Sequence, residues 1–106
     1  MDRATAVDGV IGRLKAQIGR RLRVERLILF GSRAEGGGDE GSDYDFIVVS
    51  PDFQGLSFLE RGRPLLPLRE RGVSYDFLCY TPAEFERLAS QLTFVREVAR
   101  SGVRLI

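Results

Sequence analysis

Histidine is absent from this 106-residue sequence, and cysteine occurs once. The lack of histidine excludes histidine general bases, Ser-His-Asp triads and histidine metal ligands. The single cysteine, Cys79, cannot form an internal disulfide, which fits a reducing compartment such as the cytoplasm. Because Cys79 stands in the apolar run Phe77–Tyr80, we expect it to be a buried core residue.

Long hydrophobic runs and an excess of one charge are also missing. No apolar stretch approaches the roughly 20 residues that span a bilayer, and the N-terminus lacks the apolar core of a signal peptide. The net charge is +1, so no overall field favours a membrane surface or nucleic acid. We therefore expect a cytoplasmic protein without membrane contact or direct nucleic-acid binding. The length suits one domain over residues 1–106 with a core of its own.

Hydrophobic spacing predicts the elements of that domain. An amphipathic helix is expected over residues 4–20, and strands over 24–30, 43–49 and 73–80. Residues 56–71 have helical composition, but three residues interrupt them: Gly62, Pro64 and Pro67.

The last third of the chain begins with a strong helix-start signal. Thr81 is a good N-cap, Pro82 suits the first position of a helix, and Glu84 completes a capping box. The apolar stripe continues to about residue 101, with a bend near Ser90, and residues 103–106 suit a short edge strand. Together the elements predict a small α/β or α+β sandwich; of the two we expect the α+β fold, a small mixed sheet flanked by helices.

A glycine-serine pair follows the first predicted strand. The apolar run Leu27–Phe30 leads into Gly31-Ser32, where the missing Cβ of glycine allows backbone N–H groups to approach a phosphate. The hydroxyl of Ser32 adds a donor, and Arg33 could bind a phosphate oxygen bidentately. Taken alone, the pair is more typical of an ordinary strand-to-loop turn.

Carboxylates gather at two predicted strands. Asp43 and Asp45 are two residues apart at the start of one strand, so both side chains point to one face, roughly 6.5–7 Å apart along the backbone. Such a pair can hold the two Mg²⁺ ions of a phosphate-transfer site, although a solvated strand entry is the alternative. Asp76, flanked by apolar residues on another strand, makes a purely structural explanation of all three difficult.

Arginines surround a pair of leucines in the interrupted helical segment. A solvated helix edge is the expected role of this cluster, and an interaction face is the alternative. Its members are Arg61, Arg63, Arg69 and Arg71.

At this point the chain resembles the nucleotidyltransferases of the DNA polymerase β superfamily, and most closely the minimal nucleotidyltransferases (MNT). The resemblance rests on Gly31-Ser32, ten intervening residues, Asp43-x-Asp45, and the later Asp76. It implies a polymerase β palm-like fold and transfer of a nucleoside monophosphate from a nucleoside triphosphate, with release of pyrophosphate. It also implies two Mg²⁺ ions held by Asp43 and Asp45, with Asp76 binding the catalytic ion and helping to deprotonate the acceptor.

The MNT resemblance further implies a partner. These proteins are antitoxins paired with HEPN-domain toxins, and the implied reaction is AMP transfer from ATP to a tyrosine hydroxyl of the toxin. Because nucleotidyltransferases that act alone usually carry a second domain, we expect another chain to complete the acceptor site. Two rival functions remain: a catalytically silent antitoxin that acts by binding, and a catalytic subunit that modifies a small molecule or an RNA end.

Overall fold

A four-stranded mixed sheet forms the centre of the molecule. The computed structural model describes residues 3–34, 43–68 and 72–106. The strands are β1 (Arg26–Phe30), β2 (Tyr44–Val49), β3 (Tyr75–Tyr80) and β4 (Val103–Arg104), in the order β3-β2-β1-β4. β1 is antiparallel to β2 and to β4, whereas β2 and β3 are parallel. This mixed sheet confirms the predicted α+β class.

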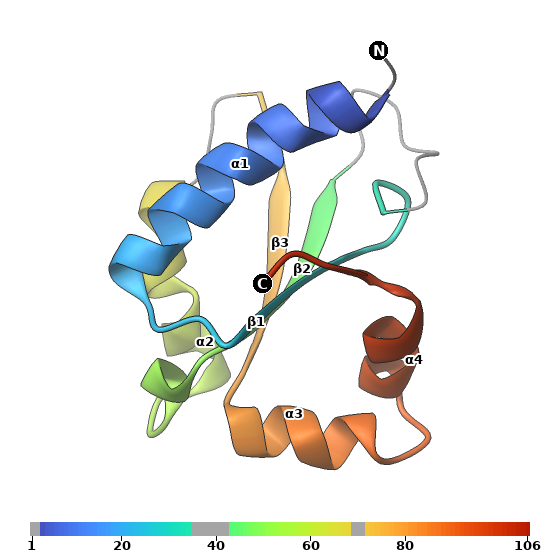
Figure 1. The fold of residues 1–106 in the computed structure, drawn as a ribbon. Coiled ribbons are helices and arrows are strands. Elements are labelled where there is room, and N and C mark those ends of the chain that lie inside the picture. The colour runs from blue at the N-terminus through green and yellow to red at the C-terminus, as the bar shows by residue number, and fades with distance from the viewer. Residues whose placement is uncertain (1–2, 35–42, 69–71) are drawn as a thin grey trace.

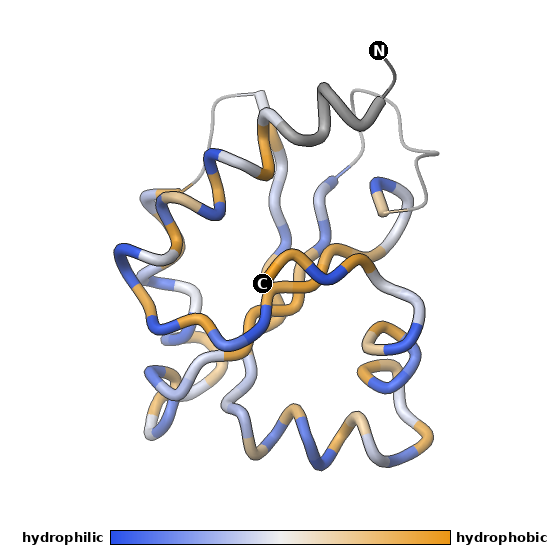
Figure 2. The backbone as a smooth tube through the Cα atoms, in the orientation of Figure 1, coloured by the Kyte–Doolittle hydropathy of each residue, from blue (hydrophilic) through white to orange (hydrophobic). Residues whose placement is uncertain are grey.

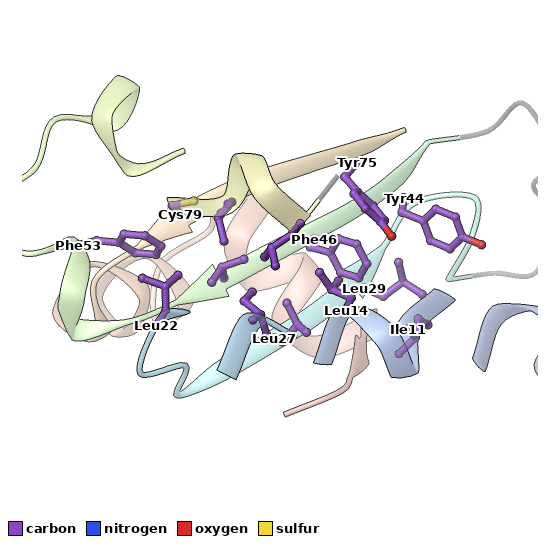
Figure 3. Packing of buried hydrophobic residues seen from close by; sticks show 14 residues of the cluster. Ile11, Leu14, Leu22, Leu27, Leu29, Tyr44, Phe46, Phe53, Tyr75 and Cys79 are labelled. Atoms are coloured by element: carbon purple, nitrogen blue, oxygen red, sulfur yellow. The ribbon is translucent and has the colours of Figure 1, made fainter. Parts of the chain in front are cut away.

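Helix α1 (Arg3–Arg21) covers one face of the sheet (Figure 1). Ile11 and Leu14 of this helix meet Leu27, Leu29 and Phe46 of the strands (Figure 3). Figure 2 shows the same division along the chain, with hydrophilic and hydrophobic residues alternating on α1 and apolar residues concentrated in the central strands. The amphipathic helix predicted near the N-terminus is therefore confirmed.

The opposite face is covered by two short helices rather than one bent helix. α3 (Pro82–Ala89) begins at the predicted capping box, where Thr81 Oγ1 accepts from the Glu84 backbone N–H at 3.2 Å. α4 (Phe94–Ser101) has Thr93 as its N-cap. Because the Thr93 hydroxyl also donates to the Leu88 carbonyl at 2.6 Å, the chain turns between the helices instead of continuing as one.

The segment between β2 and β3 contains three short helical pieces. They are the 3₁₀ turn η1 (Pro51–Phe53), the single-turn helix α2 (Phe58–Arg61) and the 3₁₀ helix η2 (Arg63–Leu68). The predicted helical structure and its break at Gly62 are confirmed up to residue 68, whereas Pro64 and Pro67 lie within η2 and do not interrupt it. Residues 69–71 lie outside the described residues. None of the described helices is long and apolar enough to cross a membrane.

Arg61 corrects the interpretation of the arginine cluster as a solvated edge. It is 6% exposed, and its guanidinium pairs with Glu84 at 2.7 Å and donates to the Cys79 carbonyl at 3.1 Å. It also donates from Nε to the Leu56 carbonyl at 3.0 Å. Arg61 therefore joins α2 to the end of β3 and the start of α3. Arg63 is exposed, as predicted, while Arg69 and Arg71 lie outside the described residues.

Candidate active site

The parallel pairing of β2 with β3 brings two of the predicted carboxylates together. Asp45 and Asp76 are direct register partners, between the pairs Tyr44–Tyr75 and Phe46–Phe77. The aromatic residues on either side point into the core beneath α1, so alternation along each strand directs both aspartates to the other face. Asp45 is half-buried and Asp76 is exposed.

Asp43 lies immediately before β2, two residues from Asp45, and is exposed. The pKa of Asp45 is raised, first by burial, then by the negative charge of Asp76 and that of Asp43. Asp45 therefore lies close enough to Asp76 and Asp43 to be repelled by them, and a bound cation would relieve this repulsion.

The carboxylates do not form a closed cluster. Within residues 3–34, 43–68 and 72–106, no group of three or more histidine, cysteine, aspartate or glutamate side chains is arranged to hold a metal ion. Asp43, Asp45 and Asp76 supply the oxygen ligands that Mg²⁺ prefers, and Mg²⁺ commonly takes only one or two carboxylates together with substrate phosphates. The donor set therefore fits a magnesium ion that arrives with a nucleotide.

Gly31 lies directly against Asp45 at the end of β1. Its φ of +78° belongs to the left-handed region that side-chain-bearing residues rarely adopt, and a Cβ built there would stand 2.5 Å from Asp45 Oδ2. The following turn is closed by the Ala34 backbone N–H, which donates to the Gly31 carbonyl at 3.1 Å. Residues 32–34 form this turn.

The two residues after Gly31 differ in their surroundings. Ser32 is exposed at the turn. The guanidinium carbon of Arg33 lies 4.5 Å from the ring centroid of Tyr44, so its cation stacks beside the start of β2. Sequence reasoning missed this contact, because it depends on the antiparallel pairing that returns β2 beside β1.

A hollow of about 270 Å³ adjoins Asp76 at the outer side of β3. Leu59, Leu66 and Phe77 line it with apolar atoms, and Arg63 lines it with a cation. Of the residues that line this hollow, sequence reasoning had considered only Arg63, for which an interaction face was the alternative role, because α2 and η2 reach this side of β3 only through the fold.

Glu84, by contrast, is fully engaged in the fold. Its carboxylate accepts from Arg61 and, at 2.8 Å, from the Thr81 backbone N–H. The hydrogen bond from Arg61 lowers the pKa of Glu84 to about 2, against the effect of burial. The hydrogen bond from the Thr81 backbone and the positive charge of Arg61 contribute smaller decreases. Glu84 is therefore a structural carboxylate rather than a fourth member of the site.

The sequence profile of the nucleotidyltransferase domain family matches residues 11–104. This match spans most of the chain and includes every candidate site residue from Gly31 to Asp76. The chain belongs to the nucleotidyltransferase domain family, within the polymerase β-like superfamily. A comparison with curated proteins gives no match.

Two solved structures share the fold. One is a provisionally assigned nucleotidyltransferase from Sulfolobus solfataricus, with a TM-score of 0.57 and 20% identity over 73% of this chain and 69% of that one. The other is the BolA domain of SufE1 from Arabidopsis thaliana, with a TM-score of 0.53 and 24% identity over 68% of this chain and 91% of that one. At these identities the likeness concerns the fold alone, and the family assignment rests on the sequence profile.

Proposed function

We propose that this protein is a Mg²⁺-dependent adenylyltransferase that transfers AMP from ATP to a tyrosine hydroxyl of a HEPN-domain toxin, and thereby acts as its antitoxin. The observation that carries the catalytic part of the proposal is the register pairing of Asp45 with Asp76 directly beside the Gly31 turn. In a nucleotidyltransferase domain, this pairing would supply a carboxylate site next to a phosphate site.

Asp43 and Asp45 would hold both Mg²⁺ ions, and Asp76 would hold only the ion nearest the acceptor. The raised pKa of Asp45 supports this assignment, because it reflects an electrostatic cost that a divalent cation removes. When bound, Mg²⁺ neutralises the phosphate charge and polarises the bond to the leaving pyrophosphate.

Gly31 and Ser32 would bind the β- and γ-phosphates, with Arg33 reaching an outer phosphate oxygen. The absent side chain of Gly31 supports this role, since a Cβ would occupy the space between the turn and Asp45. The exposed Ser32 hydroxyl is available as a donor at the same turn. Binding by Arg33 would require its guanidinium to leave, or to share, its stacking contact with Tyr44.

In the reaction, the acceptor oxygen attacks the α-phosphorus of ATP and forms a new P–O bond. The bond between the α-phosphorus and the bridging oxygen to the β-phosphate breaks, and pyrophosphate leaves. The proton of the acceptor hydroxyl passes to the carboxylate of Asp76, which is exposed and therefore accessible to an incoming group.

The partner assignment is supported by the MNT resemblance of Gly31-Ser32, Asp43-x-Asp45 and Asp76. The experiment is to incubate the purified chain with ATP labelled at the α-phosphate, Mg²⁺ and the product of the neighbouring gene, tested as the HEPN partner. Label on a tyrosine of the partner is the expected result. Tight binding without label would identify a silent antitoxin, and label only on a small molecule or an RNA end would identify the other alternative.

A further inference from the structure

Exposed apolar side chains surround the hollow beside Asp76. Leu59 is 93% exposed, Phe58 65% and Leu66 57%. A second hollow, of about 240 Å³, continues along β3 and shares Gly62 and Phe77 with the first. Scattered exposed leucines need no explanation, but an apolar group gathered along two joined hollows indicates a binding surface.

The fold holds these side chains outward from a rigid base. Leu65 and Leu68 anchor η2 in the core, at 1% and 4% exposure, while Leu66 between them remains outside. Arg61 fixes α2 from beneath through its bonds to Glu84 and the Cys79 carbonyl. The surface is therefore preorganised, and binding there would not have to order α2 or η2.

We propose that the first hollow is the acceptor subsite, and that its occupant is the phenolic side chain of a protein acceptor. This inference rests on the proposed function. Leu59 and Leu66 would contact the ring, and Arg63 could stack on it. Asp76, at the same hollow, would accept the hydroxyl proton. An aliphatic hydroxyl would leave the apolar walls unused.

A protein, rather than a free phenol, suits the rest of the surface. Phe58 and Leu78 line the second hollow, and both are exposed. They would be buried only by neighbouring residues of the molecule that carries the tyrosine. This surface is continuous with the candidate active site, because β3 contributes Asp76 to the site and Phe77 to both hollows.

The test uses nuclear magnetic resonance on the whole chain labelled with nitrogen-15. The protein is saturated with Mg²⁺ and α,β-methylene-ATP, which cannot release pyrophosphate, and titrated with N-acetyltyrosinamide, with N-acetylserinamide as the control ligand. We expect the nucleotide to shift the Gly31 signal. In the presence of the nucleotide, N-acetyltyrosinamide should then shift the signals of Leu59, Leu66 and Phe77, whereas N-acetylserinamide should not.

Matched variants locate the effect. Leu59→Glu and Leu66→Glu should weaken phenol binding about tenfold, the loss expected when an apolar contact of one leucine is removed, and leave nucleotide binding unchanged. Leu92→Glu alters a leucine that is equally exposed, at 92%, but lines neither hollow, and should have no effect.

The other outcomes would overturn the inference. A normal nucleotide response without a phenol response would remove the acceptor subsite and leave the proposed function standing. Shifts of Leu59 and Leu66 caused by the nucleotide itself would assign the hollow to the nucleoside, and shifts that depend on protein concentration alone would assign it to a second copy of this chain. Failure to bind the nucleotide at all would instead contradict the proposed function.

Discussion

Gly31 satisfies two separate requirements at one position. Its backbone is left-handed, at a φ of +78°, and its α-carbon faces the carboxylate of Asp45 so closely that a methyl group would collide with it. Gly55 has nearly the same backbone, at a φ of +84°, but nothing lies within 4 Å of a Cβ placed there. The two glycines therefore separate the effect of backbone strain from the effect of contact with the site.

We predict that Gly31→Ala and Gly55→Ala each lower the free energy of unfolding by roughly 1–2 kcal/mol, the cost of a left-handed residue with a side chain. Only Gly31→Ala should also weaken MgATP binding, because its methyl group displaces Asp45 and fills the turn. Calorimetric titration of both variants checks this. Equal MgATP affinities in the two variants would contradict the phosphate role of Gly31.

Asp45 is the carboxylate of the candidate site whose negative charge is disfavoured, by burial and by the charges of Asp76 and Asp43. Because its pKa is raised, its ionised form is disfavoured in the folded state, and the resulting loss of stability develops as the pH rises through the usual range of a carboxyl group. We predict that Asp45→Asn raises the free energy of unfolding at neutral pH without metal by up to about 1 kcal/mol, and abolishes transfer. Urea unfolding in EDTA and a transfer assay measure the two effects; full activity of the variant would exclude a metal role.

Asp76 offers a different test, because its proposed role begins only when the acceptor reacts. We predict that Asp76→Asn binds MgATP with near-normal affinity yet transfers almost no AMP, so that the loss lies in kcat rather than in nucleotide binding. Binding of the HEPN partner should persist. If Asp76→Asn transferred AMP at the normal rate, Asp76 would not be catalytic, and Glu84 could not replace it because it is held by Arg61.

At the scale of secondary structure, the sequence predicts the strands and α1 because their hydrophobic periodicity is regular. It does not reveal the division between α3 and α4, since Leu88, Leu92 and Val95 continue the apolar spacing through the turn. The turn depends on the Thr93 hydroxyl reaching the Leu88 carbonyl, a local competition that a hydropathy pattern does not record.

Arg61 shows a second limit of sequence reasoning. Among four arginines in a polar stretch, nothing distinguishes the one that is buried, because its partners come from 18 and 23 residues further along the chain. The proximity of the candidate site residues was only partly predictable. Strand alternation predicts that Asp43 and Asp45 share a face. The pairing of Asp76 with Asp45 depends on the register between β2 and β3, which alternation does not give.

The ion pair between Arg61 and Glu84 should make stability depend on acid pH. Because the pKa of Glu84 is lowered from 4.5 to about 2, its contribution is present above pH 4.5 and is lost as the pH falls toward 2. We predict that Glu84→Gln destabilises the protein at pH 7 and flattens the decline of Tm over this range. Glu86→Gln, at an exposed position of the same helix, is the control and should keep the decline.

At the scale of the whole molecule, the two faces of the sheet differ in the size of their apolar clusters and in the side chains they present. The face beneath α1 holds the larger apolar core, which includes all of the aromatic residues that alternate with Asp45 and Asp76. The other face holds a smaller cluster beneath α3 and α4, and it also presents the carboxylates. Asp45 and Asp76 therefore share the face of the smaller cluster, and the larger core lies on the opposite side of the same strands.

Occupation of the site should consequently stabilise the entire domain. We predict that free MgATP at about 100 times its Kd adds about 2.7 kcal/mol to the free energy of unfolding, and raises Tm on the order of 10 °C. ATP with EDTA should give a much smaller rise. Differential scanning calorimetry measures both, and identical Tm values with and without Mg²⁺ would contradict a metal-dependent nucleotide site.

The candidate site needs the exact register between β2 and β3, whereas the apolar core would tolerate some other registers. A slip of one residue would turn Asp76 into the core, whereas a slip of two would keep every apolar residue on its own face and move Asp76 about 6.6 Å away from Asp45. The bonds at the two ends, Tyr44 to the Ser74 carbonyl and Ser50 to the Tyr80 carbonyl, oppose such a slip. A molecule with β3 shifted by two residues could thus be well packed and still lack the proposed transferase activity. The active fraction of a preparation would then equal the fraction of chains with the correct β2–β3 register.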